Sequence, residues 1–198
     1  KLMGIFAATL ILGSATFAIA GVPDLQLSSA TGPAEACVLY NLPNADGASF
    51  DEAVAVVAFV PVDATIGLTL IDGLTAVIPN YPFEDLHLES SDGGLVACPG
   101  GTTADADTDA AGYTQWQTPL AASGATSSTA DLTVVMVNGA ALTSNGGLPI
   151  AHNSADITKD GEVNLSDVIE FAGDFYSGGY VFRSDFAFDG ILNLSDII

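Results

Sequence analysis

Residues 156–167 read D-I-T-K-D-G-E-V-N-L-S-D, and their oxygen-bearing side chains follow the spacing of a calcium-binding loop. A Ca²⁺ ion takes about 6 to 8 oxygen ligands, which a twelve-residue loop supplies from positions 1, 3, 5, 7, 9 and 12. Those positions hold Asp156, Thr158, Asp160, the backbone carbonyl of Glu162, Asn164 and Asp167. Position 6 is Gly161, at the sharp turn where positive φ favours glycine. The stretch therefore predicts a calcium site with every ligand position filled.

The same pattern returns in residues 185–196. Its ligands would be Asp185, Asp189, the backbone carbonyl of Ile191, Asn193 and Asp196, with Gly190 at the turn. Position 3 is Ala187, which has no side-chain oxygen, so this loop needs a water there or binds more weakly. An isolated D-x-D-G turn is weak evidence, but two copies of D-G-x-x-N-L-S-D-x-I in one register are hard to produce by chance. We therefore predict two calcium loops.

These two loops resemble the dockerin family, the paired calcium modules at the C-termini of secreted bacterial proteins. The resemblance covers about residues 152–198 and implies a small α-helical module, with Ca²⁺ as cofactor, that docks onto a cohesin-like domain of another protein. The docking positions that it implies are the tenth and eleventh of each loop, namely Leu165, Ser166, Leu194 and Ser195. A second helix would start at Leu194, so we expect the module to be truncated at its C-terminus.

Charge is distributed very unevenly along the chain. The net charge is −21 over 198 residues, and Lys1, Lys159 and Arg183 are the only Lys and Arg residues. Such a field repels nucleic-acid phosphates and anionic membranes, and it attracts divalent cations or basic surfaces. We interpret the acidity as a solubilising coat, and we expect no nucleic acid among the partners.

Residues 1–20 combine a positive start, an apolar run and small residues at Ala18 and Ala20. This pattern predicts a secretory signal peptide, cleaved after Ala20. The alternative is a membrane anchor, but Gly13, Ser14 and Thr16 interrupt a run that barely reaches the ~20 apolar residues of a span. We expect an extracellular or cell-surface bacterial protein with no membrane span after signal removal.

Residues 21–151 consist of short alternating or apolar runs separated by Gly, Pro, Asn and Asp, the pattern typical of a β-sandwich. In residues 65–71, Ile66, Leu68 and Leu70 share one face, which we assign to the core. We predict strands at residues 37–41, 55–60, 65–71, 85–89, 94–97, 113–117, 132–137 and 149–152.

Several turns in this region resemble the bacterial Ig-like domains of the invasin and intimin type. The matching pieces are T-L-I-D-G, I-P-N-Y-P-F-E-D, T-D-A-A-G-Y-T-Q-W and L-T-V-V-M-V-N-G, within about residues 62–138. Asp72 matches the first turn, and Thr108, Asp109 and Gly112 match a hairpin. The resemblance implies a mainly β fold: an Ig-like antiparallel β-sandwich followed by the small α-helical, dockerin-like calcium module.

The two cysteines and the single tryptophan of the chain can each be interpreted in two ways. Cys37 and Cys98 are the only cysteines, and an even count in an exported chain favours a disulfide over two separate thiols. Trp116 is assigned to the core, with a sugar-stacking platform as the alternative.

No catalytic motif stands out, so we predict a secreted, non-catalytic calcium-binding protein that mediates extracellular assembly or attachment. There is no G-x-S-x-G, C-x-x-C or glycine-rich phosphate loop. The alternative function is a carbohydrate-binding accessory module, or an appendage of a secreted polysaccharide-degrading enzyme, in which Tyr81 and Phe83 would contact polysaccharide.

Overall fold

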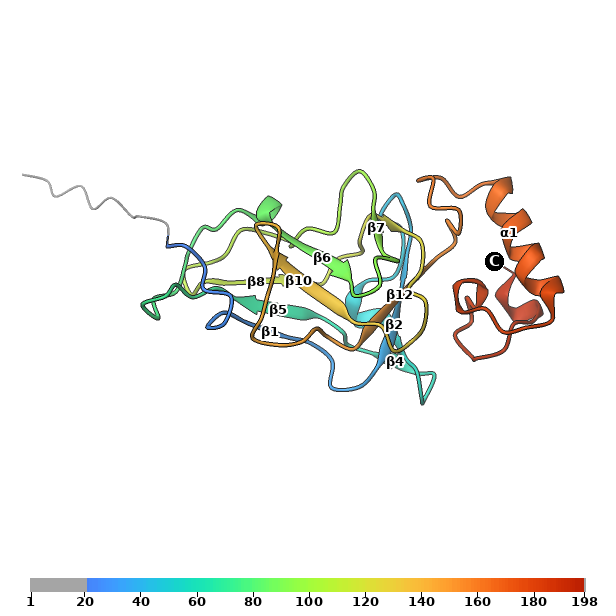
Figure 1. Ribbon diagram of the computed structural model, residues 1–198, viewed down its shortest axis with the longest axis horizontal. Coiled ribbons are helices and arrows are strands. Elements are labelled where there is room, and N and C mark those ends of the chain that lie inside the picture. Colours follow the sequence, from blue (N-terminus) through green and yellow to red (C-terminus); the bar gives the residue numbers. More distant parts are fainter. Residues whose placement is uncertain (1–20, 198) are drawn as a thin grey trace, which may run out of the picture.

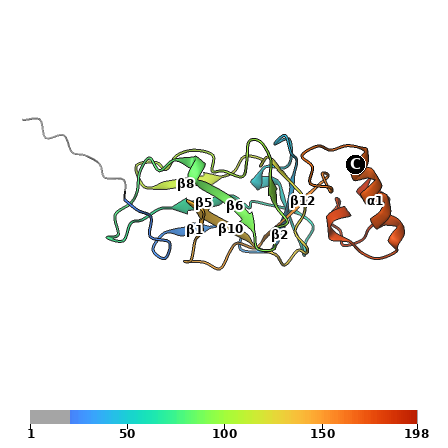
Figure 2. The ribbon, with the colours of Figure 1, turned by 45° about the horizontal axis from the view of Figure 1, so that its top comes forward.

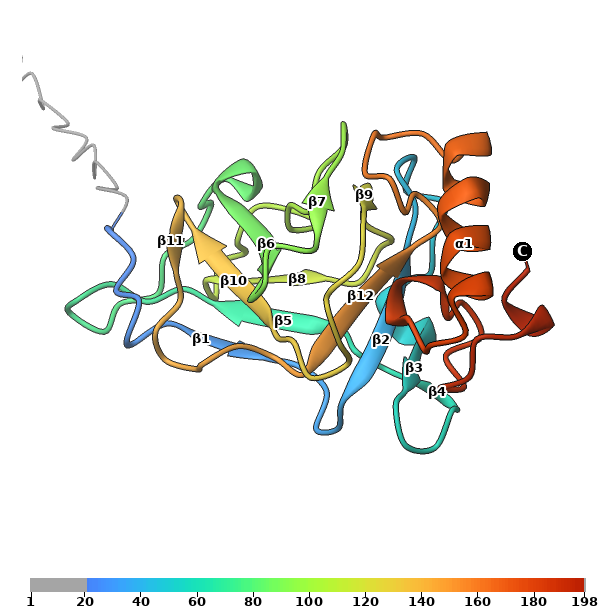
Figure 3. The ribbon, with the colours of Figure 1, turned by 45° about the vertical axis from the view of Figure 1, so that its right-hand side comes forward.

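The computed structural model describes residues 21–197, so the predicted signal peptide at residues 1–20 lies outside the described residues. The molecule is elongated, with a β-rich body at one end and a smaller C-terminal segment at the other (Figures 1 and 2). We call residues 21–154 the β body and residues 155–197 the C-terminal segment. The two meet where the last strand leaves the body (Figure 3).

The β body contains four small sheets. The first has the order β1 (Ser29–Thr31), β5 (Ile66–Thr69), β8 (Tyr113–Trp116), and the second β11 (Ala140–Ala141), β10 (Thr133–Val137), β6 (Leu86–Ser90). The third has the order β12 (Ile150–Ser154), β2 (Cys37–Asn41), β3 (Ala53–Ala55), β4 (Pro61–Val62), and the fourth pairs β7 (Val96–Ala97) with β9 (Ala122–Ser123). Short 3-10 turns cover Phe50–Glu52 and Phe83–Asp85.

One strand pair is parallel. Strand β12 runs alongside β2 in register from Ile150 opposite Cys37 to Ser154 opposite Asn41. This pairing directs β12 out of the body and into the first predicted loop (Figure 3). An all-antiparallel sandwich contains no such pair.

The predicted fold class, an Ig-like antiparallel sandwich followed by a small α-helical module, is wrong. The sheets are four small ones with a parallel pair, and α1 (Leu165–Ser177) is the single α-helix of residues 21–197. Between α1 and residue 197, the helical elements are the 3-10 turns Phe182–Ser184 and Leu194–Asp196. The turn after the second loop ends because Ile197 has extended backbone angles, φ −81° and ψ 107°. No helix of residues 21–197 has the length and apolar character to cross a bilayer.

The core of the body follows the predicted alternation. Ile66, Leu68 and Leu70 are all buried on one face of the chain around β5, as predicted. Trp116 is also buried, and its indole Nε1 donates a hydrogen bond to the carbonyl of Thr102 at 3.0 Å. The core assignment of Trp116 is confirmed, so it cannot act as a sugar-stacking platform.

The predicted strand at residues 55–60 is wrong. Residues 56–58 form a turn instead, in which the N–H of Phe59 donates to the carbonyl of Ala55 at 2.9 Å. Phe59 has φ 51°, so the chain reverses there and pairs β3 with β4. The apolar run was therefore a hairpin connection rather than one strand.

The predicted disulfide between Cys37 and Cys98 is not formed, and both residues are free thiols. Cys37 lies in β2 of the third sheet, where its Sγ is 3.9 Å from the carbonyl oxygen of Pro149. Cys98 follows β7 of the fourth sheet, and its Sγ lies 2.8 Å from Oγ of Ser123. Burial raises the pKa of Cys37 to about 12, so its thiol stays protonated.

Candidate metal centre

The first predicted loop, residues 156–167, connects β12 to α1 and folds around its own carboxylates. The Asp156 carboxylate accepts hydrogen bonds from the backbone N–H groups of Asp160 at 3.2 Å and Gly161 at 2.8 Å. The Asp167 carboxylate accepts from the N–H groups of Thr158 at 2.9 Å and Asn164 at 2.8 Å. The first and last positions of the loop are therefore fixed by the main chain between them.

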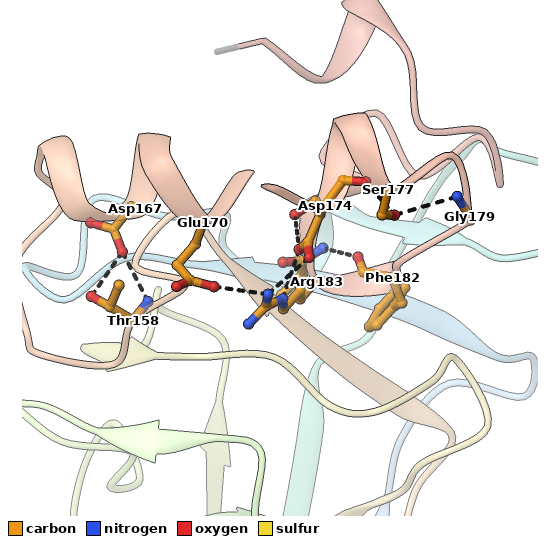
Figure 4. A network of polar contacts seen from close by, with 10 residues as sticks. Thr158, Asp167, Glu170, Asp174, Ser177, Gly179, Phe182 and Arg183 are labelled. Carbon is orange, nitrogen blue, oxygen red and sulfur yellow. Dashed lines mark hydrogen bonds and ion pairs between the residues drawn. The ribbon is translucent and has the colours of Figure 1, made fainter. Parts of the chain in front are cut away.

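Side chains of the loop meet in two groups. The Thr158 hydroxyl lies 3.0 Å from the Asp167 carboxylate (Figure 4) and 3.4 Å from the Asp156 carboxylate, so the side chains at positions 1, 3 and 12 converge. The Asn164 amide nitrogen lies 3.4 Å from the Asp160 carboxylate and 3.4 Å from the Glu162 carbonyl oxygen. All six predicted ligands thus take part in contacts within one loop.

The second loop, residues 185–196, repeats these hydrogen bonds at equivalent positions. Asp185 accepts from the N–H groups of Asp189 at 3.2 Å and Gly190 at 2.9 Å. Asp196 accepts from the N–H groups of Ala187 at 2.9 Å and Asn193 at 2.8 Å. The repeated sequence therefore gives a repeated hydrogen-bond pattern.

The backbone angles of the two loops agree as well. Position 4 is left-handed in both, with φ 65° at Lys159 and 53° at Phe188, and the glycine at position 6 has φ 88° in the first loop and 76° in the second. At position 9, Asn164 has φ −148° and ψ −169°, and Asn193 has φ −149° and ψ −166°. The two loops thus share one backbone conformation.

Both loops bury carboxylates. Asp156, Asp167, Asp185 and Asp196 are each at most 3% exposed. Among residues 21–197, the ion pairs involve only His87 and Arg183, neither of which contacts these four carboxylates. Buried carboxylates without a cation are costly, and hydrogen bonds offset only part of that cost.

The hydrogen bonds and the burial act in opposite directions on the pKa values. Burial by itself would raise the pKa of Asp167, but the hydrogen bonds from Asn164 and Thr158 outweigh it and lower the pKa. Burial raises the pKa of Asp185 above its ordinary value, despite hydrogen bonds from Tyr180 and Gly190.

Helix α1 is held against the segment that leads into the second loop. The Arg183 guanidinium makes two bonds to the Asp174 carboxylate, at 2.7 and 2.9 Å, and one to Glu170 at 3.0 Å (Figure 4). The Ser184 hydroxyl donates to Asp174 at 2.7 Å. The hydrogen bond from Arg183 is the main reason why the pKa of Asp174 lies below its ordinary value.

The β body holds the first residue of each loop. The buried Asn153 side chain of β12 donates to the carbonyls of Phe182 at 2.9 Å and Asp185 at 3.1 Å. The N–H of Gly124 donates to the carbonyl of Asp156 at 3.1 Å. Sequence reasoning missed Asn153 and Gly124, because nothing local in the sequence marks a contact with a distant loop.

The docking positions implied by the family resemblance lie on the surface at equivalent places. Leu165 and Leu194 are each 72% exposed. The backbone N–H groups of Ser166 and Ser195 each donate at 2.8 Å to the side chain of the preceding Asn164 or Asn193. The structure therefore presents the same Leu-Ser pair twice, in the helical turn that begins at position 10 of each loop.

The donors fit a hard divalent cation. Within residues 21–197, no three His, Cys, Asp or Glu side chains stand in a geometry that would hold a metal. Calcium sites, however, draw on hydroxyl, amide and main-chain oxygens as well as carboxylates. Here the donors are all oxygens, and the Asp156, Thr158 and Asp167 side chains already converge. This set matches the preference of Ca²⁺ rather than that of zinc.

Comparisons with protein families, with curated proteins and with solved structures found no match to this chain.

Proposed function

We propose that this chain is a calcium-binding protein in which residues 156–167 and 185–196 each hold one Ca²⁺. The proposal rests above all on one observation: two loops with the same hydrogen bonds bury four carboxylates that have no Lys, Arg or His partner within residues 21–197. A divalent cation supplies the missing positive charge.

The proposed ligands follow the loop positions. In the first loop they are Asp156, Thr158, Asp160, the Glu162 carbonyl, Asn164 and Asp167; in the second they are Asp185, Asp189, the Ile191 carbonyl, Asn193 and Asp196. Asn164 and Asn193 also cap the turns that follow them, since each side chain accepts from the backbone N–H two residues on. Calcium would therefore strengthen both the loop and the turn after it.

We further propose that the protein is secreted, has no catalytic activity and attaches to another extracellular protein through the C-terminal segment. The exposed Leu165 and Leu194, at equivalent positions of the two loops, support an interaction role. The loop resemblance supports a cohesin-like partner, and the net charge of −21 suits a calcium-rich exterior.

Titration calorimetry with calcium chloride tests the proposal. We expect two ions per chain for the wild type and one ion each for Asp160→Ala and Asp189→Ala. Neither Asp160 nor Asp189 is buried, so the fold should survive both substitutions. Glu84→Ala is the matched control, because it removes one exposed carboxylate from the β body and should still bind two ions. A wild-type chain that binds no calcium would refute the proposal.

A further inference from the structure

The first residue of each proposed calcium loop is tied to the β body by a hydrogen bond to its carbonyl. In the first loop, the Asp156 carbonyl accepts from the N–H of Gly124 at 3.1 Å. In the second loop, the Asp185 carbonyl accepts from the side-chain amide of Asn153, also at 3.1 Å. Asp156 follows β12 closely in the chain, whereas Asp185 lies 32 residues beyond Asn153. The second loop therefore depends on a side-chain contact where the first is also joined to the body by the chain itself.

The amide of Asn153 is held in one orientation. Asn153 is fully buried in β12, opposite Tyr40 of β2. Its Oδ1 accepts a hydrogen bond from the N–H of Ser154 at 2.7 Å. Because the oxygen is used within the body, the nitrogen faces the C-terminal segment, where it donates to the carbonyls of Phe182 at 2.9 Å and Asp185 at 3.1 Å. An amide nitrogen carries two hydrogens, and here each has one carbonyl acceptor.

The residues that Asn153 holds lead directly into the second loop. Phe182 is buried in a cluster with Val38 and Ala151 of the β body. Three residues later, the buried Asp185 carboxylate accepts from the N–H groups of Asp189 and Gly190. That carboxylate is the proposed ligand at position 1 of the loop. The contact with Asn153 therefore fixes the main chain that carries both a ligand and the first hydrogen bonds of the loop.

A fixed entry residue favours ion binding to this loop in particular. A flexible ligand residue must be ordered when the ion binds, and the cost of that ordering lowers the affinity. The carboxylates of Asp185, Asp189 and Asp196 also repel one another before an ion is present. Position 3 is Ala187, so the loop has no side-chain oxygen there to compensate. The second loop thus gains more from being preformed than a loop with all its ligands.

We propose that Asn153 is a positioning residue of the second calcium site, so that the β body raises the affinity of this loop for Ca²⁺ through one side chain. This inference rests on the proposed function, since it requires that the second loop binds calcium. Thermodynamic linkage makes the effect reciprocal: if the contact strengthens calcium binding, calcium strengthens the contact by the same factor.

Titration calorimetry with calcium chloride tests the proposal in the full chain. The background variant is Asp160→Ala, which disables the first loop. In that background, Asn153→Ala should weaken calcium binding about tenfold, as is usual when a residue that supports a metal ligand is removed.

Asn41→Ala is the matched control. It removes another buried asparagine, on the neighbouring strand β2, whose amide nitrogen contacts the Leu39 carbonyl and His152 within the β body. It should therefore destabilise the body but leave the calcium affinity unchanged. If Asn153 had a structural role alone, the two variants would give the same result.

A second measurement leaves Asn153 in place, and it decides the question if Asn153→Ala does not fold. In the Asp160→Ala chain, hydrogen exchange of the Asn153 side-chain amide, followed by NMR, should slow about tenfold when calcium is added. Unchanged calcium affinity in Asn153→Ala, or an exchange rate that calcium does not alter, would overturn the proposal while leaving calcium binding by the second loop intact. An Asp160→Ala chain that binds no calcium would instead refute the proposed function of the second loop, and this inference with it.

Discussion

The β body and the C-terminal segment bury different kinds of groups. The body buries a large apolar cluster that includes Phe50, Leu68 and Trp116. The C-terminal segment buries only two apolar side chains, Ile157 and Phe182, alongside the four loop carboxylates. Burial of hydrocarbon stabilises a fold without any added component, whereas burial of carboxylates requires compensation. The body should therefore be stable alone, and the segment should depend on calcium and on its contacts with the body.

The largest expected effect comes from the core of the body. Trp116→Ala should destabilise the body by about 3–5 kcal/mol, because it leaves a cavity and the carbonyl of Thr102 loses its hydrogen bond. Urea unfolding followed by circular dichroism measures this loss, which should be the same with and without calcium. Tyr113→Ala, at a 40% exposed position of the same strand, is the control. A loss that depends on calcium would break the distinction between the two regions.

The second-largest expected effect comes from His152, near the junction between the β body and the C-terminal segment. His152 is buried in β12, where its Nδ1 accepts from the Asn41 amide at 3.0 Å and its Nε2 contacts the Thr133 hydroxyl at 2.8 Å. Burial lowers the pKa of His152 to about 4, although the charge of Asp92 opposes this shift. The ring is therefore neutral in the folded protein over the range in which it becomes charged in the unfolded chain.

The pH dependence of stability follows from this difference between the pKa of His152 in the folded protein and in the unfolded chain. Below pH ~6.5 the unfolded chain takes up a proton at His152 that the folded protein does not bind. The free energy of unfolding should therefore be highest above pH ~6.5 and should fall by on the order of 3 kcal/mol as the pH drops toward about 4. Urea unfolding at several pH values measures the decline, and His152→Gln should show a smaller one. An equal decline in the variant would assign the effect to other groups.

Chelation of calcium should affect only the C-terminal segment. At a free calcium concentration of 100 Kd, one bound ion contributes about 2.7 kcal/mol, which is lost when the ion is removed. Hydrogen exchange in chelator should become fast over residues 155–197, including α1, and stay slow in β2, β5 and β10. Persistent protection of α1 in metal-free protein would show that packing, not calcium, holds the segment.

The smallest effect concerns the contact between α1 and the second loop. Arg183→Lys keeps the charge but loses the two-pronged contact with Asp174, which should cost about 1 kcal/mol or less because the guanidinium is partly exposed. Faster exchange in α1 alone is the expected result. Glu170→Gln weakens only the one bond between Arg183 and Glu170, so it should have a smaller effect still. If Arg183→Lys also destabilised the body, the two regions would be coupled more closely than their contacts indicate.

Features fixed by local sequence could be predicted. The alternation of Ile66, Leu68 and Leu70 gave the buried face correctly, because the strand repeat is a short-range property. Strand β2 matched its predicted bounds, residues 37–41. In the first loop the structure brings Asp156, Thr158 and Asp167 into contact, while calcium binding by these residues stays a prediction.

Features that depend on distant residues could not be predicted. The parallel pairing of β12 with β2 joins segments more than a hundred residues apart, as in Ile150 opposite Cys37, and no periodicity signals it. The number of cysteines does not indicate whether the strands that carry them lie side by side, so the predicted disulfide was wrong. The left-handed Phe59 turned an apolar run into a hairpin, although a bulky residue rarely adopts positive φ.

The parallel pairing of β12 with β2 also determines how the molecule would carry mechanical load. The described chain enters at one end of the elongated molecule and leaves through the C-terminal segment at the other (Figure 1). Tension between those ends would act on β12 through its C-terminal end, where the strand leaves the body. Its five residue pairs with β2 are then loaded in shear and must fail together rather than one after another. The pairing would thereby resist extension of the chain between the β body and the C-terminal segment.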